Sequence, residues 1–283
     1  MKAALFTGIF RNEPLEHAAR VAAEQGYDGL ELRALSHLKP DFSPRQVADV
    51  KRIADHCGLS IPIVYTGMPG DYASATWEQS RRMIDTMRRY IDWAVELGAS
   101  MICHVPGGPA PELAEESDLD KAAHWLALLA DYMHEAKLKL AMEIHHGGLL
   151  ETIGGSLALV EKINRDNVGL ILDPGNMAIA GESYGADAVE RIGRRLMHVH
   201  AKDVRFHPVR KDRLGFYKGR CFSVELMGEG HVDHRPVYRA LSEANYDGYV
   251  TLEAQPAGVA PDTIAAHEIR CFRSAIEEIK PGG

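Results

Sequence analysis

Short apolar runs and amphipathic stretches alternate along nearly the whole chain. The apolar runs are four to six residues long, which predicts buried strands. The stretches between them repeat apolar residues three and four positions apart, which predicts helices that pack on one face. We expect strands at residues 3–7, 29–33, 61–65, 101–104, 139–143, 168–173, 196–200 and 249–253. A helical crossover follows each strand, so the strands should run parallel, and eight such strands close a barrel.

The expected helices cover residues 14–25, 44–57, 77–97, 118–137, 157–164, 186–194, 236–244 and 261–279. Gly26 and Gly98 follow two of them, where a left-handed residue commonly ends a helix. The pattern predicts one α/β domain over residues 1–283, a (β/α)8 TIM barrel, with an irregular charged insertion at 204–227 after the seventh strand. An open, doubly wound sheet is the alternative. It would require a glycine-rich phosphate loop after the first strand, and Thr7-Gly-Ile-Phe-Arg-Asn12 is not one.

Composition narrows the functional classes. The chain has 283 residues, 46% of them apolar, and a formal net charge of −8 without a basic block, which disfavours a nucleic-acid-binding surface. No apolar run reaches the length of about 18 residues that a membrane span needs. The four cysteines are far apart and form no CxxC motif, and the first apolar run is too short for a signal peptide. We therefore expect reduced thiols in a cytoplasmic protein.

Four of the predicted strands end on a side chain that can bind a metal ion. These side chains are Glu143, Asp173, His200 and Glu253, at the ends of the fifth to eighth strands. Side chains alternate along a strand, and the carboxyl ends of barrel strands meet at one rim, so we expect the four to converge in the barrel mouth. Such an oxygen-rich site fits one divalent ion, Mn²⁺, Mg²⁺ or Co²⁺, with Zn²⁺ as an alternative.

Other polar residues follow the predicted strands and are candidates for chemistry or substrate binding. His145 lies two residues beyond Glu143, where an imidazole can act as an acid or a base, or can instead hold the adjoining glycine turn. The candidate substrate-binding residues are Tyr65, His104, Asn176, Lys202, Asp203 and Arg205. Near the end of the second strand, Glu31 and Arg33 either line the cleft or serve packing.

These motifs resemble the sugar phosphate isomerase/epimerase superfamily, the xylose isomerase-like barrels, over nearly the whole chain. The resembling segments are Met142-Glu-Ile-His-His146, Leu172-Asp-Pro-Gly-Asn176, His198-Val-His-Ala-Lys-Asp203, Gly228-Glu-Gly-His-Val-Asp233 and Thr251-Leu-Glu-Ala254. The resemblance implies one divalent ion, often Mn²⁺, held by Glu143, Asp173, His200 and Glu253. Members include ketose 3-epimerases, inosose dehydratases, dehydroshikimate dehydratases and hydroxypyruvate isomerases. Many epimerases carry a histidine three residues after the aspartate ligand, whereas this chain carries Asn176, which cannot carry a proton at neutral pH.

We expect a metal-dependent sugar or polyol isomerase or epimerase, with Glu143, Glu253 and His145 as catalytic residues. The two glutamates would move a proton next to a carbonyl, and the ion would stabilise the enediolate. Expulsion of a leaving group from the same enolate gives the alternative, a dehydratase or lyase, which includes a subunit of a carbon-glycoside-cleaving enzyme. Asn176 and His145 favour this branch over a standard ketose epimerase.

Two more remote classes are an endonuclease IV-like nuclease and a non-catalytic sugar-binding subunit. The net charge of −8 and Asn176 disfavour the nuclease, and the complete set of four ligand-type residues disfavours the binding subunit. The expected partner is a small keto-sugar, without nucleic acid or membrane. We expect a homo-oligomer, or a hetero-oligomer if the chain belongs to a lyase complex.

Overall fold

Eight parallel strands close into a barrel in the computed structural model, which describes residues 1–210 and 214–279. Around the barrel they follow the order β1 (Lys2–Phe6), β11 (Tyr249–Leu252), β7 (Leu196–Ala201), β6 (Val168–Leu172), β5 (Lys139–Glu143), β4 (Met101–Val105), β3 (Ser60–Pro69) and β2 (Gly29–Arg33). All eight neighbouring pairs are parallel, because each connection crosses over outside the sheet. The predicted TIM barrel is confirmed, and the open sheet is excluded.

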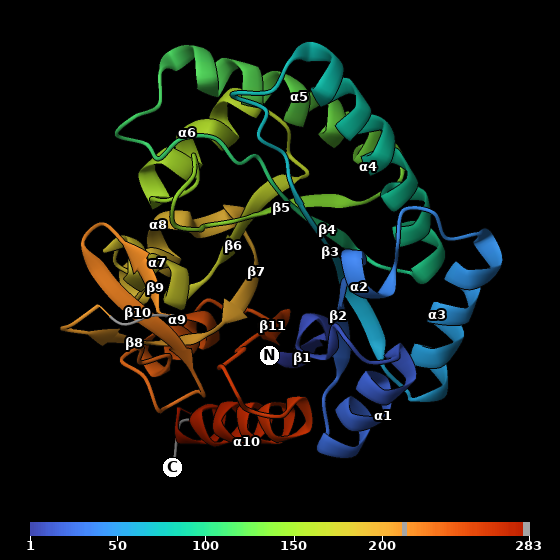
Figure 1. Ribbon diagram of the computed structural model, residues 1–283, viewed down its shortest axis with the longest axis vertical. Coiled ribbons are helices and arrows are strands. Elements are labelled where there is room, and N and C mark those ends of the chain that lie inside the picture. Colours follow the sequence, from blue (N-terminus) through green and yellow to red (C-terminus); the bar gives the residue numbers. More distant parts are fainter. Residues whose placement is uncertain (211–213, 280–283) are drawn as a thin grey trace.

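Helices surround the barrel (Figure 1). They are α1 (Leu15–Gln25), α2 (Ala34–His37), α3 (Pro44–His56), α4 (Trp77–Leu97), α5 (Glu116–Glu135), α6 (Ile153–Ile163), α7 (Pro174–Ala180), α8 (Ala186–Ile192), α9 (Arg235–Glu243) and α10 (Pro261–Glu278), with short 3₁₀ turns η1 (Thr7–Phe10) and η2 (Gly193–Arg195). Local signals explain their bounds. Thr76 forms a capping box with Gln79 at the start of α4, and Gly98 ends that helix at φ 75°.

The strands separate two apolar regions. Side chains such as Leu140 and Met142 of β5 face outward into the core beneath the helices. Ala141 faces inward, where it packs with residues of neighbouring strands inside the barrel. Because side chains alternate, Glu143 shares the inward face with Ala141, and Asp173 shares it with the inward Ile171. This alternation directs the strand-end side chains toward the barrel axis.

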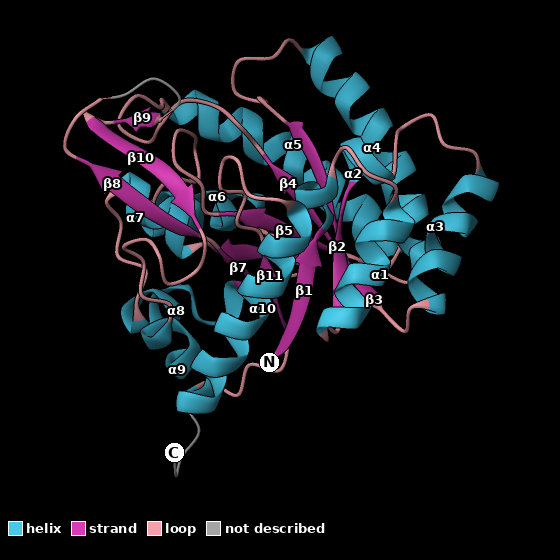
Figure 2. Ribbon diagram, turned by 60° about the horizontal axis from the view of Figure 1, so that its bottom comes forward, coloured by secondary structure: helices cyan, strands magenta, loops and turns pink. Residues whose placement is uncertain are grey.

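The segment after β7 differs from the irregular insertion that the sequence analysis expected. It forms a three-stranded antiparallel sheet of β8 (Asp203–His207), β10 (Arg220–Glu225) and β9 (Gly215–Tyr217), beside α7 (Figures 1 and 2). Residues 211–213 of this segment and 280–283 of the expected domain lie outside the described residues. The sheet packs on α7 through Val204, Phe206 and Phe222. Most of its side chains are only partly buried, so the alternation that marks a strand is weak in the sequence.

Two further expectations concern membrane-spanning helices and the cysteine thiols. Within residues 1–210 and 214–279, no helix combines the length and apolar character that crossing a membrane would require. All four cysteines, Cys57, Cys103, Cys221 and Cys271, are free thiols. The thiols therefore match the expectation that the chain has no disulfide.

Candidate active site

The structure brings the four predicted ligand side chains together at the mouth of the barrel. Glu143 ends β5, His200 lies in β7, and Asp173 and Glu253 directly follow β6 and β11. One ligand atom from each lies within 4.8 Å of the other three, and all four residues are buried. Asp173 is also the N-cap of α7, a short helix that the sequence analysis did not predict, and this turn fixes the direction of its carboxylate.

His200 connects this cluster to a deeper carboxylate. Its Nδ1 lies 3.2 Å from Glu143 Oε1 and 3.5 Å from Glu253 Oε2, whereas its Nε2 lies 3.1 Å from Glu31 Oε2. Burial disfavours the imidazolium, but the charges of Glu31, Glu253 and Glu143 outweigh burial and raise the pKa of His200. A carboxylate on the far nitrogen is the arrangement that orients a metal-binding histidine.

A second group that could bind a metal ion consists of Glu31, His198 and His200, so His200 belongs to both groups. His198 Nε2 lies 3.3 Å from Glu31 Oε2 and 2.8 Å from Thr251 Oγ1, one layer deeper in the barrel. Neither Glu31 nor His198 has any exposed surface. The upper group opens toward solvent through Glu143 and Glu253, which line a cavity, so it is the group that a substrate can reach.

The side chain of Asn176 is buried and forms hydrogen bonds with the ligand side chains. Its Nδ2 donates to Glu143 Oε1 at 2.8 Å and to Asp173 Oδ2 at 2.7 Å. Its backbone N–H donates to Asp173 Oδ1 at 2.9 Å, and its Oδ1 lies 3.2 Å from His146 Nδ1. Asn176 therefore holds two of the four ligands in place, and the substrate contact expected for it stays a prediction.

Lys202 supplies a positive charge inside the carboxylate cluster. Its Nζ lies 2.9 Å from Asp173 Oδ2 and 2.5 Å from Glu253 Oε1. Burial would lower the pKa of Lys202, but Asp173, Glu253 and Glu143 outweigh burial and raise it. Burial and the neighbouring carboxylates raise the pKa of Glu253 to about 8 despite Lys202.

A cavity of about 310 Å³ lies above the cluster. It is lined by Phe6, Arg11, Arg33, Tyr65, Gly67, Glu143, His145, Lys202, Glu253 and Gln255. Its volume lies at the lower end of the range for small-molecule sites, about 300–1,000 Å³. His145 stacks on His146 at 4.4 Å between ring centroids, and its Nδ1 lies 2.8 Å from the His146 carbonyl oxygen. The cavity therefore contains three of the predicted side chains besides the two glutamates: His145, Tyr65 and Lys202.

Two candidate substrate-binding residues lie apart from this cavity. His104 is buried between Thr66 and Tyr72, with its Nδ1 3.1 Å from Thr66 Oγ1 and its Nε2 2.9 Å from Tyr72 Oη. Burial lowers the pKa of His104 to about 4. It lines a smaller cavity of about 190 Å³ beside the site. Arg205 belongs to β8, where it lies 3.8 Å from Glu225 and also binds the Glu229 carbonyl, so it serves the added sheet.

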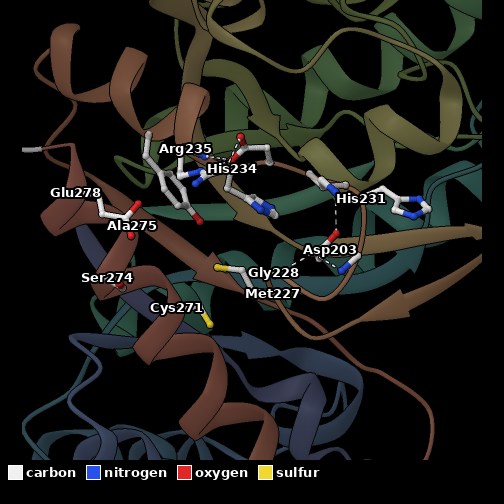
Figure 3. A pocket seen from close by; sticks show the side chains of 14 residues that line it. Asp203, Met227, Gly228, His231, His234, Arg235, Cys271, Ser274, Ala275 and Glu278 are labelled. Atoms are coloured by element: carbon white, nitrogen blue, oxygen red, sulfur yellow. Dashed lines mark hydrogen bonds and ion pairs between the residues drawn. The ribbon is translucent and has the colours of Figure 1, made fainter.

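Asp203 also differs from the expected substrate contact. It accepts hydrogen bonds from four backbone N–H groups, those of Val204, Gly228, Gly230 and Val232, at 2.7–2.9 Å. Figure 3 shows Asp203 beside Gly228. With no exposed surface, it anchors the loop that follows β10. That loop borders a larger cavity of about 460 Å³, which none of the four ligand residues lines. The larger cavity is therefore separate from the candidate active site.

The chemistry of the donor set fits one divalent cation. Three carboxylates and one imidazole offer oxygen and nitrogen ligands to the same point, and no cysteine belongs to this group among the described side chains. Glu143, Asp173, His200 and Glu253 would hold the ion, with Asn176 and Glu31 orienting them. Three carboxylates in contact repel one another, and a divalent ion would remove that repulsion.

The family described as "Xylose isomerase-like TIM barrel" matches residues 19–275. The chain belongs to this family, and the resemblance inferred from its motifs is confirmed. An inosose dehydratase of Geobacillus thermodenitrificans (strain NG80-2) is 25% identical over 230 residues, which are 75% of this chain and 74% of that protein. The chain spans about half the length of several other curated inosose dehydratases that it matches.

Two solved structures share the fold. The crystal structure of the IOLI protein with a binding zinc atom superposes with a TM-score of 0.81 at 18% identity, over 99% of this chain and 100% of that chain. The structure of D-psicose 3-epimerase in the presence of D-fructose gives 0.78 at 16% identity, over 100% of each chain. Both likenesses concern the fold alone. At the level of the family, the relatives are sugar epimerases and dehydratases.

Several residues of the site were missed or left open by the sequence analysis. Glu31 and Arg33 are two residues apart in β2 and so point the same way, a signal that was visible but weak. Arg11 and Gln255 lie in loops, where no periodicity predicts which way a side chain points. His146 is next to His145, and the structure alone shows that it contacts Asn176.

Proposed function

We propose that the protein is a divalent-metal-dependent dehydratase or lyase, which acts on a keto-sugar or keto-polyol. It would remove a proton next to the ketone and then eliminate a hydroxyl group. The observation that carries this proposal is the cluster of four ligand-type side chains, which opens through Glu143 and Glu253 into a monosaccharide-sized cavity. The match to an inosose dehydratase over three quarters of the chain supports the same reaction class.

The chain's own residues have separate roles in this proposal. Glu253 takes the proton next to the ketone, because its carboxyl group lines the cavity beside Lys202. His145, in the same cavity, donates a proton to the departing hydroxyl group. Lys202 places a fixed positive charge beside Glu253 and stabilises the negative charge that develops. A bound divalent ion, which we propose to be Mn²⁺, would polarise the ketone.

An epimerase is the second candidate, and one observation favours it. Glu143 and Glu253 both line the cavity, so one carboxylate can take a proton and the other can return it to the opposite face. The two reactions share the first proton transfer and differ in the second step. Elimination needs a proton donor for the leaving hydroxyl group, and the presence of His145 in the same cavity supports this reaction.

The test measures deuterium and water loss together. The Mn²⁺-loaded protein is incubated in D₂O with a panel of inososes, 2-keto sugars and 3-keto sugars, and the products are followed by mass spectrometry and NMR. Loss of one water from a substrate establishes the dehydratase, whereas deuterium uptake without water loss establishes the epimerase. Glu253→Gln should lower either rate by about 10²–10⁴-fold at saturating Mn²⁺.

A control addresses proton return within the active site, which would hide the label. It uses the turned-over substrate already deuterated at the carbon next to the ketone. A substrate that is turned over without gaining or losing deuterium in either direction would contradict the proposed proton transfer.

A further inference from the structure

Two arginines near the ends of the first two strands line the active-site cavity. Arg11 follows η1, and Arg33 ends β2, and both line the same cavity as Glu143, Lys202 and Glu253. Neither belongs to the four-residue ligand cluster, and neither takes part in the proposed proton transfers. The proposed reaction therefore does not explain why two arginines line this cavity.

The hydrogen-bond partners that hold both guanidinium groups are neutral. Arg11 Nη1 donates to Gln255 Oε1 at 2.7 Å, and Arg33 Nη1 donates to Ser36 Oγ at 2.7 Å. No carboxylate within the described ranges forms an ion pair with either side chain. A guanidinium has five N–H donors, so each arginine keeps most of its donors available.

The position of Arg33 depends on the backbone beneath it. A Cβ atom at Gly8 would lie 2.8 Å from Arg33 Cδ and 2.2 Å from the Phe6 ring, so only glycine leaves room for this packing. The backbone N–H of Arg33 donates to Thr7 Oγ1 at 2.8 Å. Arg33 is therefore anchored at its backbone, along its stem and at its guanidinium, which distinguishes it from a freely moving surface arginine.

The charges that line the cavity leave these two arginines unbalanced, and Glu31, buried beside His200, offsets at most one of them. The negative charges of Glu143, Asp173 and Glu253 are offset by Lys202 and by the one divalent ion that the cluster fits. The two positive charges of Arg11 and Arg33 then have no counterpart among the cavity-lining residues. A planar guanidinium matches a carboxylate or a phosphate with two parallel hydrogen bonds.

We propose that Arg11 and Arg33 form a subsite for an anionic group of the substrate, a carboxylate or a phosphate carried away from the ketone. The substrate would then be a keto-sugar acid or a phosphorylated keto-sugar rather than a neutral one. This inference rests on the proposed function only in that both sites would bind one molecule. The anion would fix which carbon of the substrate lies beside Glu253.

The test measures anion binding in the metal-free full-length protein, so that no anion can bind to a metal ion. The probes are inorganic phosphate and acetate, followed by NMR of the ¹⁵N-labelled arginine side chains. Arg11→Met and Arg33→Met remove the charge and keep the length of the stem. Arg45→Met is the matched control, because Arg45 is an exposed arginine on α3, outside the cavity.

We expect at least one probe to shift the arginine signals saturably. Each of the two cavity variants should weaken binding about 10–100-fold, since a charged hydrogen bond is lost, and Arg45→Met should leave it unchanged. Binding of phosphate alone assigns a phosphorylated substrate, binding of acetate alone assigns a sugar acid, and binding of both supports the shared anion subsite. Absence of saturable binding, or binding that neither cavity variant weakens, overturns the proposal.

Mn²⁺ titration of the same variants separates this proposal from the proposed function. Arg11→Met and Arg33→Met should bind Mn²⁺ as the unaltered protein does. If the protein binds anions but no Mn²⁺, the proposed function fails and the subsite stands. If Mn²⁺ binds and enolisation occurs while the anions do not bind, the subsite fails and the proposed function stands.

Discussion

Two groups of buried carboxyl groups in this fold have different partners. Glu143, Asp173 and Glu253 lie together at the barrel mouth with Glu31 deeper in the barrel, and each of the four contacts His200 or Lys202. Asp203 and Glu268 lie beneath the loop after β10, where their hydrogen-bond partners are backbone N–H groups.

The difference separates a ligand-binding role from a structural one. Backbone N–H groups are fixed dipoles, so the carboxylates they bind hold a loop and have no need of an ion. The carboxylates in the barrel mouth repel one another and depend on cations. A cluster of the second kind that opens into a cavity is therefore the candidate for metal binding. Four substitutions test this contrast.

The largest effect concerns Glu268 and the pH dependence of stability. Burial raises the pKa of Glu268 from 4.5 to about 8, since only one of its oxygens has a partner, the Met227 N–H at 2.8 Å. The folded protein therefore retains a proton that the unfolded chain releases. The resulting stability is complete below about pH 4.5 and is lost as the pH rises to about 8, by up to about 5 kcal/mol.

Glu268→Gln should remove this loss, because glutamine stays neutral at every pH. Urea unfolding between pH 5 and pH 9 measures the free energy of unfolding of both proteins. Glu277→Gln, on the exposed side of the same helix, is the control and should follow the unaltered protein. If the free energies of unfolding of Glu268→Gln and the unaltered protein change with pH in parallel, Glu268 is ionised in the folded protein.

The next effect concerns Asp203, the anchor of the loop. Asp203→Ala leaves four backbone N–H groups without their acceptor and should lower the free energy of unfolding by about 3 kcal/mol. Asp233→Asn is the control, because Asp233 pairs with Arg235 at a half-exposed position and should change stability by less than about 1 kcal/mol. Equal losses in the two variants would contradict a structural role specific to Asp203.

A third effect concerns His145 as the proton donor. His145→Ala should lower turnover by about 10²-fold or more, because a positioned proton donor is lost, while the bound metal stays the same. Steady-state kinetics and metal analysis measure the two quantities. His56→Ala, at an exposed histidine of α3, is the control. If turnover is unchanged, His145 supports the adjoining glycine turn and donates no proton.

The smallest effect concerns Glu31, which contacts the far nitrogen of His200. Glu31→Gln keeps an oxygen acceptor but removes the charge, and it should weaken Mn²⁺ binding by about 10–100-fold. Excess Mn²⁺ should then restore activity. Calorimetric titration measures the affinity, with Glu24→Gln, at an exposed position of α1, as the control. A variant with full Mn²⁺ affinity would show that Glu31 does not orient His200.

Much of the fold was predictable from the chain itself. The bounds of α4, β2 and β5 were predicted to the residue, because Gly98 ends α4 and short apolar runs mark the two strands. The alternation of side chains also placed Glu143 and Asp173 on the inward face of the barrel. Element bounds and side-chain alternation depend on residues that are neighbours in the sequence, so the sequence alone predicts them. The added sheet was not predicted, because its strands are half-buried and pair antiparallel outside the barrel.

The roles of side chains at the site depended on the tertiary structure. Asn176 and Asp203 both follow a strand that carries a predicted ligand, yet one binds two ligand carboxylates and the other binds a loop far along the chain. Arg11 joins the same cavity as Glu253 although 242 positions separate them. The order of residues determines the strands and their inward faces through local alternation. Closure of the barrel determines which partners each charged group meets, because it joins loops that are distant in sequence.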